Sequence, residues 1–304
     1  MAMLAGLVPI FLILGLGVVA RRFGLLDDAS ATGLNRLVVY IALPALFIAK
    51  VGTAPLESAL SVRLMFATAV VSAAATLLAL GWARTLRLPP SHRGALAQGA
   101  VRGNIVYFTF PLILTTYGDD ALRLAAVTAT VLIPVMNLLA VAALELYRPA
   151  GSKDTHIILR VIGNPIVIGA LASLLLALVH WRPWGWLDTT LNALADLAFP
   201  GALLALGAQL EVGQWRKLWH SLAAASVVKL ALMPAAGWWL LRLLGASPGE
   251  IAVGVLLLAA PTAVASHSVA ADLGGDVELA GSCVLVTTVL SVATYVVWVL
   301  LLGS

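Results

Sequence analysis

The chain of 304 residues is 62% hydrophobic and only 11% charged, with a mean hydropathy of +1.03. A soluble domain is usually about 45–50% apolar and about 25% charged, so this composition excludes both a soluble enzyme and a disordered chain. The net charge of +4 comes from basic residues at the ends of apolar runs, which indicates membrane topology rather than nucleic-acid binding.

Ten apolar runs are candidates for transmembrane helices, each of which needs about 20 apolar residues. The runs are continuous rather than alternating, which favours helices over membrane strands. They cover residues 3–20, 35–49, 64–83, 94–117, 122–146, 157–179, 187–209, 218–241, 251–271 and 277–302. The sequence therefore predicts an all-α membrane protein with ten transmembrane helices.

Arginine and lysine residues gather beside the connections after the first, third, fifth and seventh runs, eleven of them against five on the opposite side. Because basic loops stay in the cytoplasm, both termini are predicted on the non-cytoplasmic side of the cytoplasmic membrane. The first run has no basic residue before it and is followed by Arg21 and Arg22. We therefore expect a retained helix rather than a cleaved signal peptide.

Several features recur at an offset of about 156 residues, which predicts an internal repeat. They are Pro9 and Pro165, Pro44 and Pro200, Gly81-Trp82 and Gly237-Trp238, and Gly118-Asp119 and Gly275-Asp276. Five runs per half is an odd number, so the second half must be inverted in the membrane. We expect a first five-helix repeat in 1–147, a cytoplasmic connection in 148–156 and a second, inverted repeat in 157–304. Inverted repeats are typical of secondary transporters, with the substrate site between them near the midplane.

The fourth and ninth runs each contain a proline in mid-span, Pro111 and Pro261. Proline interrupts a helix, and discontinuous helices at equivalent positions indicate a transporter's binding site. Because proline suits the first position of a helix, we expect a second half-helix to begin at each proline, with its amino end at the midplane. Those positive ends favour an anionic substrate, and a carboxylate fits best. The alternative is that both prolines merely kink packed helices.

Polar residues beside the two breaks are candidate substrate-binding residues. They are Asn104, Tyr107, Thr109 and Pro111 in the fourth run, and Pro261, Thr262, Ser266 and His267 in the ninth. The His267 imidazole either carries protons or is a neutral hydrogen-bonding group. Three further residues, Asn137, Asn164 and Gln209, either line the site or bridge helices.

Charged residues inside the runs are costly in a membrane, which makes them candidates for function. Lys229 lies near the middle of the eighth run, Asp196 lies within the seventh, and Arg102 lies on the cytoplasmic side of the break in the fourth. Asp196 and Lys229 are interpreted either as a buried structural ion pair or as residues that couple transport to a proton, and the sequence leaves open whether they touch.

The sequence lacks complete motifs of membrane enzymes and ATPases. The sequence contains no HExxH zinc pattern and no Walker A glycine loop. Residues 273–276 do not match the GxGD pattern of intramembrane aspartyl proteases, because Leu273 stands where the pattern has its first glycine. We therefore expect no catalytic residues, no metal site, no cofactor and no ATP hydrolysis.

Short motifs along most of the chain carry a family resemblance. They are Leu43-Pro44-Ala45-Leu46-Phe47, Arg102-Gly103-Asn104 with Pro111-Leu112, Asn164-Pro165, Leu206-Gly207-Ala208-Gln209-Leu210, Lys229-Leu230 with Pro234, and Ala260-Pro261-Thr262-Ala263-Val264. Together they resemble the auxin efflux carrier family, which comprises the plant auxin carriers and bacterial permeases. Thr109 stands where this family usually has glycine, and Ala265 stands where bacterial members usually have asparagine.

The resemblance implies two inverted five-helix repeats, broken fourth and ninth helices that cross, and movement of organic anions. We predict a secondary transporter that moves a small organic anion by alternating access. An uncoupled facilitator for the same anions and a ligand-binding membrane sensor are the alternatives. Expected partners are the anion, a proton or sodium as coupling ion, and the lipid bilayer, without nucleic acid; the sequence leaves a homodimer open.

Overall fold

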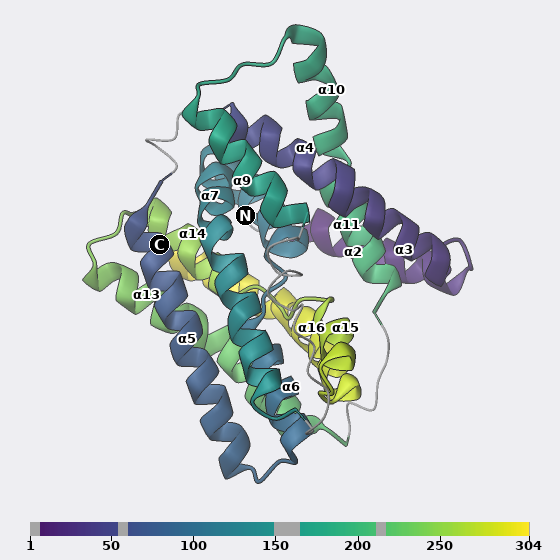
Figure 1. Cartoon of the computed structure of the whole chain (residues 1–304), viewed down its shortest axis with the longest axis vertical. Helices are drawn as coiled ribbons and strands as arrows, with labels where there is room; N and C mark the ends of the chain where they lie inside the picture. The colour runs from purple at the N-terminus through teal and green to yellow at the C-terminus, as the bar shows by residue number, and fades with distance from the viewer. Residues whose placement is uncertain (1–6, 54–59, 149–164, 211–216, 304) are drawn as a thin grey trace. The chain divides into compact units, whose positions relative to one another are not determined.

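The computed structural model describes residues 7–53, 60–148, 165–210 and 217–303, and every regular element in these ranges is a helix (Figure 1). Six helical stretches are long and apolar enough to cross a membrane. They are Asp28–Gly52, Val62–Thr85, Ile105–Glu145, Gly185–Ala208, Trp219–Leu243 and Val277–Leu302, and shorter apolar helices cover Ile168–Leu178 and Pro248–Leu258. The chain is therefore an all-α, multi-pass membrane protein, as its composition predicts.

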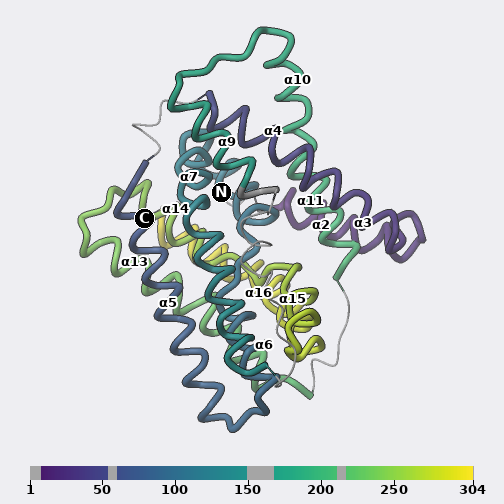
Figure 2. The backbone as a smooth tube through the Cα atoms, in the orientation of Figure 1, coloured from purple at the N-terminus to yellow at the C-terminus, as the bar shows by residue number. Residues whose placement is uncertain are grey.

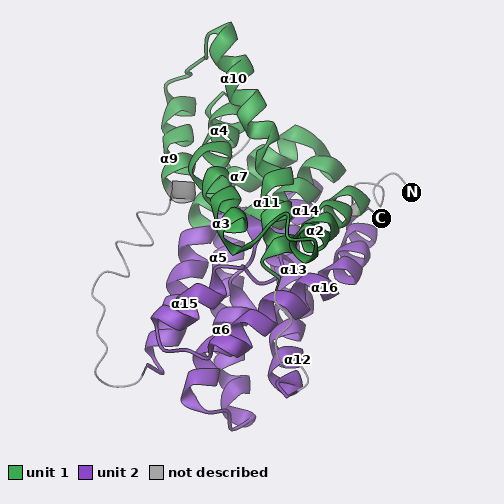
Figure 3. Cartoon of the chain, turned by 90° about the vertical axis from the view of Figure 1, so that its right-hand side faces the viewer, with its two compact units in different colours: residues 1–61, 106–131, 162–210 green, residues 62–105, 132–161, 211–304 purple. Residues whose placement is uncertain are grey.

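Two compact units divide the chain (Figure 3). Unit 1 comprises residues 1–61, 106–131 and 162–210, and unit 2 comprises residues 62–105, 132–161 and 211–304. Each unit takes segments from both halves of the sequence. The two predicted repeats therefore do not coincide with the two compact units. That the second repeat is inverted in the membrane relative to the first stays a prediction.

Unit 1 is built mainly from short helices, several of which follow one another without a gap in the chain. Its elements are α2 (Leu7–Arg22), α3 (Asp28–Leu37), η1 (Val38–Ala42), α4 (Leu43–Phe47), η2 (Ile48–Gly52), the first part of α7 (Phe110–Glu145), α9 (Pro165–Leu178), α10 (Gly185–Asp196) and α11 (Ala198–Ala208). The carboxylate of Asp27 caps α3 by accepting a hydrogen bond from Ser30 N at 2.8 Å, which lowers the pKa of this carboxyl. Helix α11 packs against α2 and α3, and α9 packs against α4 and η2 (Figure 2).

Two glycines allow α2 and α11 to approach closely. A Cβ added at Gly17 on α2 would overlap with the backbone of Leu204, and one added at Gly207 on α11 would overlap with the backbone of Leu14. Small residues at such crossings let transmembrane helices pack backbone against backbone. The glycines thus fix the distance between these two helices of unit 1.

Unit 2 surrounds one buried helix. Its elements are α5 (Val62–Thr85), α6 (Pro90–Val101), the second part of α7, α12 (Trp219–Val227), η5 (Val228–Leu232), α13 (Met233–Leu243), α14 (Pro248–Leu258), α15 (Ser266–Asp272) and α16 (Val277–Leu302). Helix α6 is buried continuously from Gly94 to Val101 and packs against α5, α12 and α16. This burial places the end of α6, and the break that follows it, inside unit 2.

Three π-helical turns each end two residues before a proline. Turn η1 precedes Pro44, η4 (Ile105–Thr109) precedes Pro111, and η5 precedes Pro234. Proline lacks an N–H and its ring clashes with the carbonyl four residues earlier, so a local widening of the helix lets the chain continue past it. These prolines therefore bend helices without ending them.

The boundary between the fourth and fifth predicted runs lies within α7. Gly118 has φ 82° and ψ −172°, a backbone conformation outside the helical region that only glycine adopts readily. The sequence predicts the fourth run to end at residue 117 and the fifth to begin at residue 122. The kink at Gly118 confirms this boundary.

The helix breaks in the fourth and ninth runs are present, but they do not lie where the prolines predict them. Helix α6 ends at Val101 and helical structure resumes at Ile105, so Pro111 lies inside a continuing helix. Helix α14 ends at Leu258 and α15 begins at Ser266, five residues after Pro261. The prediction that a half-helix begins at each proline is therefore wrong. The π-helical turn η4 lets the helix continue past Pro111, and Pro261 lies in the extended segment between α14 and α15.

Candidate functional site

The two breaks meet inside unit 2, and we call residues 102–104 and 260–263 the crossing. Gly103 and Thr262 form an isolated antiparallel bridge. Asn104 N donates to Pro261 O at 2.7 Å, and Ala263 N donates to Arg102 O at 2.9 Å. Broken helices leave backbone groups without partners, and this pairing satisfies several of them away from water. The fourth and ninth runs are thus broken at segments that contact each other.

Thr262 anchors the crossing to two helices. Its hydroxyl donates to Gly99 O of α6 at 2.7 Å, and its backbone N donates to Thr287 Oγ1 of α16 at 2.9 Å. The side chain is completely buried. Because the hydroxyl hydrogen is used inside unit 2, Thr262 has a structural role, and its predicted contact with substrate stays a prediction.

Four residues around the crossing carry buried polar atoms without a hydrogen-bond partner in the described part of the chain, and we call them the polar cluster. These atoms are Gln98 Oε1, Arg102 Nη1, Asn104 Nδ2 and Ser266 Oγ. A buried polar group without a partner costs about 1–3 kcal/mol, and a charged one costs more. Three of the four atoms are donors, and one donor belongs to a guanidinium. The cluster therefore has the chemistry of an anion site.

Other hydrogen bonds hold the polar cluster in position. Gln98 Nε2 donates to Ser266 O at 2.9 Å and so joins α6 to α15. Arg102 Nε donates to Asn137 Oδ1 at 2.9 Å, which orients the guanidinium from the second part of α7. The sequence left open whether Asn137 lines a site or bridges helices, and this contact is a bridge. The sequence marks Arg102 as a costly charge but does not reveal its contact with Asn137, which is 35 residues away in the sequence.

The predicted site residues of η4 and α7 belong to unit 1. Tyr107 Oη donates to Asn35 Oδ1 of α3 at 2.7 Å, while Thr109 and Pro111 are buried. In unit 2, Pro261 is buried within the crossing. His267 has an exposed side chain on α15, beside Gly281 of α16.

Two further polar residues singled out from the sequence add little to this geometry. Gln209 is partly buried and follows the last residue of α11. Asn164 lies outside the described residues.

Lys229 lies in η5 and is completely buried. Its ammonium donates to Val101 O at 3.0 Å and to Leu258 O at 3.2 Å, and Met233 Sδ lies 3.9 Å away. Both carbonyls belong to the last residue of a broken half-helix, α6 or α14. Asp196, its predicted partner, is an exposed residue at the end of α10 in unit 1. The ion pair stays a prediction, but carbonyls of unit 2 already bind the ammonium.

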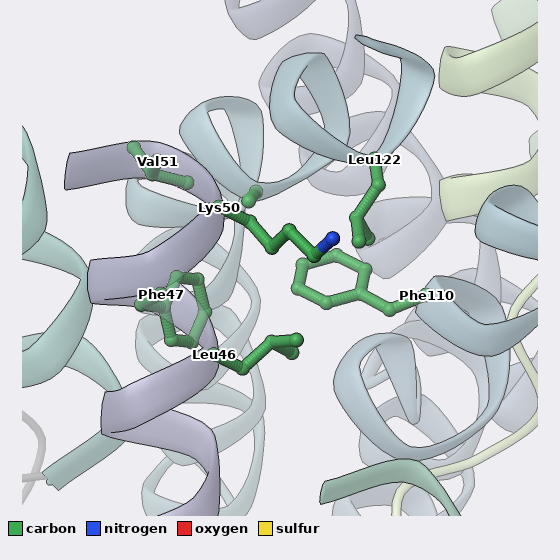
Figure 4. A pocket seen from close by; sticks show the side chains of 7 residues that line it. Leu46, Phe47, Lys50, Val51, Phe110 and Leu122 are labelled. Atoms are coloured by element: carbon green, nitrogen blue, oxygen red, sulfur yellow. The ribbon is translucent and has the colours of Figure 1, made fainter. Parts of the chain in front are cut away.

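Unit 1 contains a narrow apolar pocket that includes one lysine (Figure 4). It is lined by Leu46, Phe47, Lys50, Val51, Phe110, Leu122 and Ala126. Figure 4 shows the Lys50 side chain beside the Phe110 ring, and its ammonium forms an ion pair with Asp119 at 2.8 Å. The charge of Lys50 is thus balanced by Asp119 within unit 1, and the other lining side chains among the described residues are apolar.

Comparisons with known proteins show which family the chain belongs to. A family model described as "Membrane transport protein" matches residues 2–299. A protein of Rhizobium meliloti (strain 1021) named "Putative malonate transporter" is 29% identical over 310 residues, with 97% of this chain and 94% of the relative covered. An "Uncharacterized transporter" of Methanothermobacter thermautotrophicus is 25% identical over 291 residues, with 93% of both chains covered. The chain belongs to this membrane transport family, which is the auxin efflux carrier family.

Proposed function

We propose that the chain is a secondary transporter that moves a small carboxylate across the cytoplasmic membrane by alternating access around the polar cluster. The observation that carries this proposal is the set of buried donors without partners at a helix crossing, Arg102 Nη1 and Asn104 Nδ2 above all. Irregular backbone inside a membrane is tolerated where it is buried in protein or lines a cavity, and in transporters it forms the substrate site.

The chemistry of the two donors favours a carboxylate over a neutral substrate. Arginine stays charged in proteins, and a buried cation without a counter-charge is strongly unfavourable. None of the ion pairs among the described residues includes Arg102. A carboxylate that accepts hydrogen bonds from Arg102 and Asn104 would supply both the charge and the acceptors that the cluster lacks. The name of the Rhizobium meliloti relative points to the same substrate class.

Ten helices in two inverted repeats are part of the proposal, and the order of elements supports it. Elements correspond at an offset of about 156 residues. Helix α2 corresponds to α9, the stretch α3–η2 to α10–α11, α5 to α12–α13, α6 to α14, and the second part of α7 to α16. Both members of the first four pairs belong to the same compact unit, whereas the α7 stretch that corresponds to α16 is divided between the two units. An odd number of helices per repeat inverts the second half, and both termini then lie on the non-cytoplasmic side.

The uncoupled facilitator and the membrane sensor predict different fluxes. Purified protein in proteoliposomes should take up labelled malonate, and an imposed pH, sodium or voltage gradient should change the accumulation. A facilitator would equilibrate malonate without responding to the chemical gradients. A sensor would bind malonate and show no flux, which would contradict the proposal. Protein-free liposomes are the control.

A further inference from the structure

The Lys229 ammonium lies where the carboxyl ends of α6 and α14 come together. The last carbonyls of a helix lack intrahelical partners and carry a negative charge of roughly 0.5 from the helix dipole. One ammonium donating to one terminal carbonyl of each helix therefore balances about one unit of negative charge. The two contacts, at 3.0 Å and 3.2 Å, have ordinary hydrogen-bond lengths.

The crossing passes close to this ammonium at Gly103. A Cβ added at Gly103 would lie 3.1 Å from Lys229 Nζ and 3.0 Å from Ala260 Cβ. Turn η5 packs against α5, α6 and α16, so the lysine comes from a well-packed element. Gly103 is thus the residue type that lets the crossing pass directly beside the ammonium.

We propose that Lys229 is the resident cation of the crossing. Its ammonium holds the carboxyl ends of α6 and α14 together in the place that a carbonyl-coordinated metal cation could otherwise occupy. Unit 2 then needs no bound metal cation to keep its two broken helices paired. Because Val101 directly precedes Arg102, the same contact positions the polar cluster. This last consequence rests on the proposed anion site, whereas the pairing of the helices does not.

Thermal unfolding of the purified, ligand-free protein in detergent tests the pairing. We compare wild type, Lys229→Ala, Lys229→Met and the control Lys50→Ala, each in ethylammonium chloride or in choline chloride of equal ionic strength. Lys229→Ala should lower Tm by about 5–10 °C, and ethylammonium should restore part of the loss because it fits the space that the side chain leaves. Lys229→Met should also lower Tm but should not respond, since its side chain fills that space. Wild type should have the same Tm in both salts, and so should Lys50→Ala.

Two results would overturn the inference. One is a Tm of Lys229→Met equal to that of wild type, because then neither the charge nor its hydrogen bonds matter. The other is an equal effect of ethylammonium on all four proteins. If Lys229→Ala cannot be purified, Gly103→Ala replaces it, since this change keeps the lysine and crowds its ammonium. Gly103→Ala should melt below wild type in both salts, and an unchanged Tm would overturn the inference.

A second arm separates this inference from the proposed function. Malonate, added as its choline salt, should raise the Tm of wild type and should raise that of Lys229→Met less, because the polar cluster is less well positioned. Loss of the malonate effect in wild type, with the ethylammonium pattern intact, would contradict the anion site and leave the resident cation standing. An equal malonate effect in both proteins would contradict the positioning role.

Discussion

Arg102 and Lys229 are neighbouring cations of unit 2 with different surroundings. Two helix-terminal carbonyls bind the Lys229 ammonium. In contrast, Arg102 Nη1 is buried without a hydrogen-bond partner among the described residues, and Arg102 Nε donates to Asn137 Oδ1. The sequence reveals both residues as costly charges inside apolar runs. It does not reveal their partners, because those contacts join residues 29 to 128 positions apart. Arg102 is therefore absent from the predicted substrate-binding residues, and the contacts of Lys229 with two carbonyls are not predicted.

At the polar cluster, Asn104→Ala and Arg102→Gln should each reduce malonate uptake into proteoliposomes by about 10–100-fold, because each removes a charge-assisted hydrogen bond worth about 1.5–3 kcal/mol. The Tm of each variant should stay within a few degrees of wild type, since neither change adds an unpaired buried charge to those already present. Asn192→Ala on α10 is the matched control and should transport normally. Wild-type uptake by both cluster variants would remove these residues from the site.

Asp196→Asn separates the two roles that the sequence left open. Because carbonyls of Val101 and Leu258 already bind Lys229, we expect the Tm of Asp196→Asn to equal that of wild type. Breaking a buried ion pair would instead cost about 3–5 kcal/mol and lower Tm clearly. If Asp196 carries the coupling proton, the variant should exchange malonate normally and lose its response to a pH gradient. A stable variant that a pH gradient still drives would exclude both roles.

The elements illustrate what proline patterns predict and what they miss. The mid-span prolines correctly predicted interrupted helices in the fourth and ninth runs. They misplaced the interruptions, because a π turn accommodates Pro111 and the true break follows α6 at Arg102–Asn104. Pairing of Gly103 with Thr262 fixes the breaks, and that contact joins segments far apart in the sequence. Local propensity therefore gives the existence of a break, and tertiary pairing gives its position.

The α2–α11 contact of unit 1 yields a prediction from two glycines on one helix. Gly17→Ala should destabilise the protein by about 1–3 kcal/mol, because its Cβ would overlap with the Leu204 backbone. Gly15→Ala on the same helix is the control, since a Cβ there meets no other atom within 4 Å. Thermal unfolding of the two variants should show a lower Tm for Gly17→Ala only. Equal Tm values would show that α2 and α11 do not pack through Gly17.

At the scale of the whole molecule, composition alone identified a polytopic helical membrane protein, and motifs spread over most of the chain identified its family. The length of the apolar runs also predicted α16, whose bounds Val277–Leu302 match the last run. The grouping into two compact units was not predictable in this way. It depends on which helices pack together, and each unit draws its helices from both halves of the sequence.

The orientation of the chain can be tested with fusions at its carboxyl end. The proposed ten helices and the distribution of basic residues predict that Met1 and Ser304 lie on the non-cytoplasmic side. Alkaline phosphatase fused after Ser304 should therefore be active, and green fluorescent protein fused at the same position should be dark. A fluorescent green fluorescent protein fusion together with an inactive phosphatase fusion would contradict the ten-helix topology.

Counterflow of labelled malonate tests the central claim, transport of a carboxylate at the polar cluster, most directly. Proteoliposomes are loaded with unlabelled malonate and diluted into labelled malonate without any ion gradient, so the assay requires translocation and no coupling ion. Wild type should accumulate label transiently above protein-free liposomes, and Asn104→Ala should lose most of this accumulation. Absence of counterflow in wild type, with malonate and with other small carboxylates, would contradict the account.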